Sequence, residues 1–210
     1  MAYLLEKTFE ALRQLKDRPK QARAYAKWKE NGRPNPPPHL VKQQVLRQFA
    51  ERFGLEILVE TGTFRGDMVQ AMKSCFKMVY SIELSDELFE AARRRFHRQA
   101  NVEIIHGDSG RELSRLIPRL DRPTLFWLDG HYSAGNTARG EKDTPVYEEL
   151  DAIFNSHLEN YAIIIDDARL FGVDPSYPTL SELRDRIENR LPNCEIQVES
   201  DSIRITLRQA

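Results

Sequence analysis

The sequence contains little cysteine and no long apolar run. Its two cysteines, Cys75 and Cys194, lie far apart and match neither a metal-binding pair nor a disulfide framework, and we expect both to be buried thiols. No stretch approaches the roughly 20 apolar residues of a membrane-spanning helix. An N-terminal secretion signal is also missing, because Tyr3-Leu4-Leu5 is followed at once by Glu6 and Lys7. We therefore expect a cytoplasmic protein with no membrane span.

Neither positive nor negative charge predominates in the sequence. The 31 basic and 32 acidic residues give a net charge of −1, so no global field attracts nucleic acid or an anionic membrane. The stretch from Arg13 to Arg33 is an exception, because it is rich in basic residues and its only acidic residues are Asp17 and Glu30. Such a stretch is typical of a solvated helical face, and an anionic substrate or partner is the alternative.

The first quarter of the chain has helical spacing and a proline cluster. Apolar residues recur every three or four positions at Leu5, Phe9, Leu12 and Leu15, and again at Val41, Val45, Phe49 and Phe53. A further helix is predicted over about 20–30, and the prolines at 34 and 36–38 end it. We expect residues 1–54 to form a helical extension or lid that packs on a core domain of residues 55–210.

From residue 57 onward, short apolar runs alternate with amphipathic helical segments. The runs predict strands at Ile57–Thr61, Met78–Leu84, Val102–His106, Thr124–Leu128 and Tyr161–Ile165. The segments between them predict helices at Asp67–Phe76, Asp86–Arg98, Gly110–Ile117 and Pro145–His157. Strands without polar alternation, each followed by a helix, indicate a parallel sheet that is covered on both faces.

The carboxyl terminus breaks this rhythm. A helix near Leu180–Leu191 is followed by the alternating segments Glu195–Glu199 and Ile203–Leu207, which predict a tight antiparallel hairpin. The fold class is therefore α/β: a Rossmann-like, mostly parallel seven-stranded sheet with a C-terminal antiparallel hairpin and an N-terminal helical extension. In such sheets, ligands bind at the edge formed by the carboxyl ends of the strands.

A glycine-containing loop follows the first strand. It reads Glu60-Thr61-Gly62-Thr63-Phe64-Arg65-Gly66-Asp67. Gly62 would let the backbone approach a ligand closely, and Gly66 would let the loop enter the next helix. The loop lacks the spacing of a nicotinamide-binding GxGxxG, and a plain tight turn is the alternative. It resembles the cofactor loop of class I S-adenosylmethionine-dependent methyltransferases, which implies cofactor contacts from Glu60, Gly62, Thr63 and Gly66.

The next two strand ends carry polar residues that fit the same resemblance. Glu83 falls about twenty residues beyond the glycine loop, where a carboxylate can accept hydrogen bonds from ribose hydroxyls. A charge at a helix amino terminus is the alternative. The resemblance implies that Asp108 and Ser109 contact the adenine. Either residue could equally cap the helix that follows.

Three carboxylates follow the fourth and fifth predicted strands, namely Asp129, Asp166 and Asp167. Unpaired, they would repel one another and raise at least one pKa. A bound cation removes that cost, and oxygen ligands suit Mg²⁺, Mn²⁺ or Ca²⁺. Here the chain resembles the metal-dependent small-molecule O-methyltransferases, including those that act on catechols and sugars. That resemblance implies that the three aspartates ligate Mg²⁺.

The same resemblance suggests a catalytic base. The lysine of the catechol enzymes would fall on Tyr132, whereas the base of some sugar enzymes would fall on His131. We expect His131 to accept the acceptor's proton while a metal at Asp129 lowers the hydroxyl pKa. Alternatively, His131 orients Asp129, or Asp129 contacts the cofactor's methionine amino group without any metal. The loop 133–143 either closes over substrate or is a plain surface loop.

The sequence therefore predicts an S-adenosylmethionine-dependent methyltransferase that acts on a hydroxyl of a small molecule, such as a sugar, diol or hydroxy acid, with help from Mg²⁺. The pattern of the whole chain, including residues 36–43, also resembles uncharacterised bacterial methyltransferase-domain proteins, which supplies no substrate. DNA is not expected as a substrate, because residues 129–132 lack the Asn/Asp-Pro-Pro-aromatic segment of DNA amino-methylating enzymes. RNA or protein methylation, and a non-catalytic nucleotide-binding module, remain alternatives. A homo-oligomer is compatible with the sequence.

Overall fold

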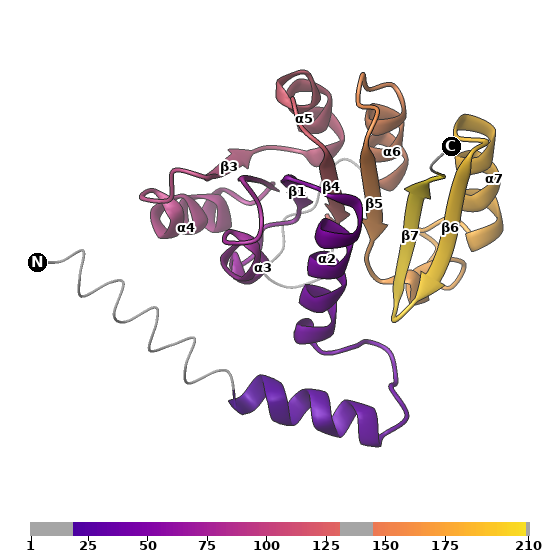
Figure 1. The fold of residues 1–210 in the computed structure, drawn as a ribbon, viewed down its shortest axis with the longest axis horizontal. Helices are drawn as coiled ribbons and strands as arrows, with labels where there is room; N and C mark the ends of the chain where they lie inside the picture. Colours follow the sequence, from indigo (N-terminus) through magenta and orange to yellow (C-terminus); the bar gives the residue numbers. More distant parts are fainter. Residues whose placement is uncertain (1–18, 131–144, 209–210) are drawn as a thin grey trace, which may run out of the picture.

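The computed structural model describes residues 19–130 and 145–208. Within them, seven strands form one sheet in the order β3-β2-β1-β4-β5-β7-β6 (Figure 1). The strands are β1 (Ile57–Thr61), β2 (Met78–Glu83), β3 (Val102–His106), β4 (Thr124–Leu128), β5 (Tyr161–Ile165), β6 (Cys194–Glu199) and β7 (Ser202–Leu207). The first five are parallel, and β7 pairs antiparallel with both β5 and β6. The predicted fold class is confirmed.

Helices cover both faces of the sheet. They are α2 (His39–Phe53), α3 (Asp67–Met72), α4 (Asp86–Phe96), α5 (Ser109–Leu116), α6 (Val146–Phe154) and α7 (Leu180–Arg190), with 3-10 turns η1 (Ile117–Arg119) and η2 (Ala168–Leu170). One buried cluster joins α2, α3 and α4 to the sheet, and a second joins α5, α6 and α7 to the opposite face. Side chains alternate between these two cores along each strand, so strands buried on both faces read as continuous apolar runs.

The element boundaries follow the sequence closely, with local corrections. Four of the five parallel strands begin and end where predicted. The first crossover helix is shorter than predicted, because α3 ends at Met72 rather than at Phe76. Cys194 is buried as expected, but Cys75 is exposed. Cys75 lies in the connection between α3 and β2, beyond the end of the helix.

The C-terminal hairpin turns on two residues. Ser200 and Asp201 have φ of 50° and 61°, the left-handed conformation at both central positions that matches the twist of the flanking strands. The turn places Asp201, which is 3% exposed, beside the end of β5, since the backbone N–H of Ala168 donates to the Asp201 carbonyl at 2.9 Å. A residue near the end of the chain thereby reaches the edge where the parallel strands end.

The two described N-terminal helices differ in their packing. In α2, Val45, Leu46 and Phe49 enter the buried cluster on one sheet face. The helix over residues 19–30 is mostly exposed, and it lies apart from the sheet in Figure 1. The predicted apolar stripe of Leu5–Leu15 lies outside the described residues. In the part of the chain that the structure describes, no helix has both the length and the apolar character needed to cross a membrane.

Candidate functional site

Polar side chains follow the buried apolar residues at the carboxyl ends of four parallel strands. Leu58, Val79, Trp127 and Ile164 belong to the cluster that packs against α2. Two residues further along their strands stand Glu60, Ser81, Asp129 and Asp166. Because side chains alternate along a strand, these four polar residues face the α2 side of the sheet. The apolar core thus gives way to a polar site where the parallel strands end.

The loop after β1 lies tightly against the end of β4. Gly62 has φ of 84°, and a Cβ there would lie 2.6 Å from the Asp129 carbonyl oxygen. Gly62 N–H donates to the Ile82 carbonyl at 2.9 Å, and Gly66, with φ of 71°, is the N-cap residue of α3. Phe64, in the middle of the loop, has φ of 49° and is 44% exposed. A residue other than glycine thus adopts the left-handed conformation here.

Glu60 and Thr63 form a buried polar group with Ser81. The Ser81 hydroxyl donates to Glu60 Oε2 at 2.5 Å, and Thr63 Oγ1 lies 2.6 Å from Ser81 Oγ. Burial raises the pKa of Glu60 to about 8, against the opposing hydrogen bond from Ser81. A ligand that carries positive charge would favour the ionised carboxylate here.

Glu83 is held directly beside this loop. Its Oε2 accepts the Phe64 backbone N–H at 2.7 Å, and its Oε1 accepts the Ser85 N–H at 2.9 Å. The carboxylate is therefore fixed between the ends of β1 and β2. Ionised carboxylate oxygens have further lone pairs, so each can still accept a hydrogen bond from a ligand hydroxyl. The structure brings Glu83 and the glycine loop together.

Asp108 and Ser109 begin α5 after β3. Asp108 is in the cap position, but its side chain makes no capping hydrogen bond. Ser109 is buried, and its hydroxyl donates to Glu149 Oε1 of α6 at 2.6 Å. Burial raises the pKa of Glu149 to about 7, while hydrogen bonds from Ser109 and Thr61 act against that rise. Glu149 was missed by the sequence analysis, because its position on an amphipathic helix gives no sign that the helix buries it.

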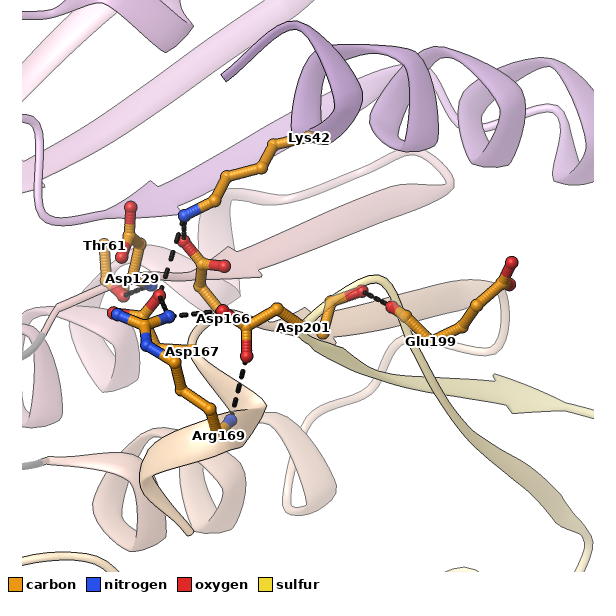
Figure 2. A network of polar contacts seen from close by, with 9 residues as sticks. Lys42, Thr61, Asp129, Asp166, Asp167, Arg169, Glu199 and Asp201 are labelled. Atoms are coloured by element: carbon orange, nitrogen blue, oxygen red, sulfur yellow. Dashed lines mark hydrogen bonds and ion pairs between the residues drawn. The ribbon is translucent and has the colours of Figure 1, made fainter. Parts of the chain in front are cut away.

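The three predicted aspartates converge. Ligand atoms of Asp129, Asp166 and Asp167 all lie within 4.8 Å of one another, and Figure 2 shows them gathered at the ends of β4 and β5. Burial raises the pKa values of Asp129 and Asp166, and neighbouring carboxylates add to the rise. Among the described residues, Asp166 Oδ1 is buried without a hydrogen-bond partner.

A lysine that the sequence analysis missed lies against these carboxylates. Lys42, in the first turn of α2, is in hydrogen-bonding contact with Asp166, and its Nζ is 3.7 Å from Asp167 (Figure 2). Burial lowers the pKa of Lys42, but the charges of Asp166, Asp129 and Asp167 outweigh it, so the net shift is upward. Lys42 precedes Val45 and Leu46 by three and four residues, which places it on the buried face of its helix.

Asp167 is braced from the opposite side. It adopts a left-handed conformation with φ of 55°, and its Oδ1 accepts a hydrogen bond from Arg169 Nη1 at 2.6 Å. The same guanidinium contacts Asp201, and the Arg169 N–H donates to Asp201 Oδ1 at 2.9 Å. Asp201 at the hairpin turn therefore holds Arg169, which in turn holds Asp167. Only the long-range pairing of β7 with β5 creates this contact, so local sequence could not indicate it.

Two predicted features lie outside the described residues, namely His131, the predicted base, and the loop 133–143. All other predicted site residues lie at the carboxyl edge of the sheet. They fall into three neighbouring groups: around the β1 loop and β2, at the start of α5 after β3, and around the acidic cluster. Gly62 lies close to the Asp129 carbonyl and so connects the first group with the acidic cluster.

Comparisons with known proteins agree on the fold. No protein-family model and no curated protein sequence matches the chain. The O-methyltransferase TomG of Streptomyces achromogenes, involved in tomaymycin synthesis and solved with S-adenosylmethionine, superposes with a TM-score of 0.56 at 17% identity, over 90% of this chain and 89% of its own. An O-methyltransferase of Bacillus cereus, solved with S-adenosylhomocysteine, gives 0.58 at 17%, over 83% and 84%. The S-adenosylhomocysteine-bound methyltransferase PaMTH1 of Podospora anserina gives 0.57 at 16%, over 80% and 78%. The chain has the fold of the class I S-adenosylmethionine-dependent methyltransferases.

Proposed function

We propose that this protein transfers the methyl group of S-adenosylmethionine to a hydroxyl group of a small-molecule acceptor. One observation carries the proposal: Glu83 and the Gly62 loop meet through the hydrogen bond from Phe64 N–H to Glu83 Oε2 at 2.7 Å. A turn that admits close backbone approach therefore adjoins a fixed carboxylate that can accept the ribose hydroxyls. Three solved proteins of the same fold contain S-adenosylmethionine or S-adenosylhomocysteine.

The cofactor would lie along the edge from β3 to β4. In this proposal, Gly62, Thr63 and Gly66 approach its methionine portion, and Glu60 or Asp129 faces the charged amino and sulfonium groups. Glu83 accepts the ribose hydroxyls, while Asp108 and the backbone of Ser109 contact the adenine. The buried bond between Ser109 and Glu149 supports this last role, because it holds the start of α5 in place.

Methyl transfer itself needs few groups from the protein. The acceptor oxygen attacks the methyl carbon, the carbon–sulfur bond breaks, and its electron pair stays on sulfur, which gives S-adenosylhomocysteine. The proton of the acceptor hydroxyl goes to His131, whose place two residues after Asp129 supports this role. Orientation of the two reactants can supply on the order of 7–11 kcal/mol. The remaining requirement is positive charge near the developing oxyanion.

The sequence predicts that Mg²⁺ supplies this charge at Asp129, Asp166 and Asp167. Three converging carboxylates are a suitable donor set. The position of Lys42 against Asp166 speaks against the ion, because a divalent cation there would adjoin an ammonium group. The Lys42 ammonium can itself stabilise negative charge on an acceptor oxygen. A cytoplasmic location, a homo-oligomeric state and a lid formed by residues 1–54 remain predictions of the sequence.

Calorimetry with S-adenosylhomocysteine tests the cofactor assignment. We expect the Glu83→Gln variant to bind about tenfold to hundredfold more weakly, because it loses charge-assisted hydrogen bonds to the ribose. Glu87→Gln is the matched control, because Glu87 is exposed in the first turn of α4. It removes a carboxylate that acts only as a charge at the helix amino terminus, which is the alternative role for Glu83. Failure of the wild-type chain to bind the ligand would contradict the proposal.

A second assay tests the acceptor class. Release of S-adenosylhomocysteine is followed with diols, catechols, sugars and hydroxy acids as acceptors. Turnover with any of them supports hydroxyl methylation. Cofactor binding with turnover only on RNA or protein would instead favour the alternative enzyme class, and cofactor binding without any turnover would favour a non-catalytic module.

A further inference from the structure

The acidic cluster already holds a positive charge that belongs to the chain. Lys42 reaches it from α2 and is in contact with Asp166, with Nζ 3.7 Å from Asp167. Its side chain is 18% exposed, and that of Asp166 is 1% exposed. The ammonium group is thus removed from most of the solvent and is surrounded by carboxylates.

A divalent ion on these carboxylates would compete with Lys42 for the same space. Mg²⁺ and Ca²⁺ bind carboxylate oxygens at about 2.0–2.6 Å. An ion bonded to Asp166 Oδ2, the oxygen that Lys42 contacts, would therefore lie within about 5 Å of Lys42 Nζ. At that separation, and with little solvent between them, a divalent ion and an ammonium group repel each other strongly.

The lysine is not held there by charge alone. Val45, Leu46 and Phe49 fix α2 on the sheet by burial, so the first turn of the helix stays above the ends of β4 and β5. Lys42 Nζ also lies 6.0 Å from the ring centre of Trp127, which extends the favourable contact. Moving the ammonium out to admit a metal ion would give up these contacts and leave the stem of Lys42 without its packing.

We propose that the Lys42 ammonium is the resident cation of the acidic cluster and takes the place of a divalent metal ion there. The ammonium group has three N–H donors, and the contact with Asp166 uses one of them, so another can donate a hydrogen bond to the acceptor oxygen. Asp166 Oδ1, buried without a partner among the described residues, can accept a hydrogen bond from a second acceptor hydroxyl. The two groups together suit an acceptor with adjacent hydroxyls. The statement about the acceptor rests on the proposed function, whereas the exchange of a metal for a lysine does not.

Direct measurement of Mn²⁺ binding to the full chain tests the proposal. The chain is freed of metal with a chelator and titrated with Mn²⁺ while the unbound ion is followed by electron paramagnetic resonance. We expect no saturable site in the wild type and none in Lys42→Arg, which keeps the cation. Lys42→Met removes the charge but keeps the apolar stem, and it should gain a saturable Mn²⁺ site with an affinity at least about tenfold above the upper limit measured for the wild type. Adding Asp166→Asn to Lys42→Met should abolish that site.

Arg47→Met is the matched control, because it removes a positive charge from the exposed side of the same helix. It should leave Mn²⁺ binding as in the wild type. A saturable site in the wild type that disappears in Asp166→Asn overturns the proposal, and so does equal Mn²⁺ affinity in Lys42→Met and Arg47→Met. If Lys42→Met does not fold, the wild-type, Lys42→Arg and Asp166→Asn titrations still decide. Calorimetry with S-adenosylhomocysteine is read separately, so failure of the proposed function is distinguished from failure of the cation exchange.

Discussion

Replacing Gly62 by alanine should damage both stability and cofactor binding. The added Cβ would lie 2.6 Å from the Asp129 carbonyl oxygen and 3.1 Å from its carbon. That carbonyl cannot retreat easily, because the Asp129 N–H donates to the Thr61 carbonyl at 3.2 Å in the β1–β4 pairing. The left-handed φ of 84° costs alanine about 1–2 kcal/mol, and the overlap should add about 1–3 kcal/mol.

The two contributions can be separated with a second glycine. Gly54 also has a positive φ, 61°, but a Cβ there meets nothing within 4 Å. Gly54→Ala should therefore lower Tm by roughly 2–8 °C through backbone strain alone. Gly62→Ala should lower it by about twice as much and weaken S-adenosylhomocysteine binding at least about tenfold. Thermal unfolding and calorimetry measure the two effects. Equal losses of Tm, or unchanged ligand affinity in Gly62→Ala, would refute the close packing of this loop against β4.

Two further predictions concern buried carboxyl groups. Burial raises the pKa of Glu60 to about 8 from its ordinary value of 4.5, so the folded state keeps a proton that the unfolded state loses. The contribution of Glu60 to stability is therefore fully present below about pH 4.5 and falls by about 1.4 kcal/mol per pH unit up to about pH 8. Glu60→Gln should make the decline of Tm over this pH range less steep, and an unchanged slope would count against the assignment. Asp201→Asn weakens the contact with Arg169 and should cost about 1.5–3 kcal/mol in denaturant unfolding; exposed Asp185→Asn should cost under about 0.5 kcal/mol, and similar costs for the two would show that the brace is unimportant.

The sheet was predictable because its signals are local. Apolar runs such as Tyr161–Ile165 are long enough to mark buried strands, and the residue after each run marks the carboxyl edge. The convergence of Asp129, Asp166 and Asp167 followed from the same rule, since parallel strands end together. The hairpin was also readable, because the turn at Ser200 and Asp201 is short and alternating strands flank it.

The missing parts of the site depend on packing between distant segments. Lys42 precedes Asp166 by 124 positions, and only the seating of α2 on the sheet makes them neighbours. Glu149 becomes relevant because α6 buries it against Ser109. Periodicity placed Lys42 on the apolar face of its helix, and a lysine at such a position was the available signal for a buried ion pair. For Asp201 no local signal exists, because its contact requires the pairing of β7 with β5.

The hairpin makes completion of the sheet depend on residues that are synthesised after all five parallel strands. Until β7 is added, β5 is a sheet edge whose Ile163 and Ile165 have no antiparallel neighbours, although in the finished protein they pair with Ile205 and Ile203. Such an edge invites pairing with other chains. A nascent or C-terminally truncated protein would therefore expose an unpaired strand edge and lack the contact between Asp201 and Arg169. Aggregation of shortened chains and loss of this contact should thus occur at the same truncation point.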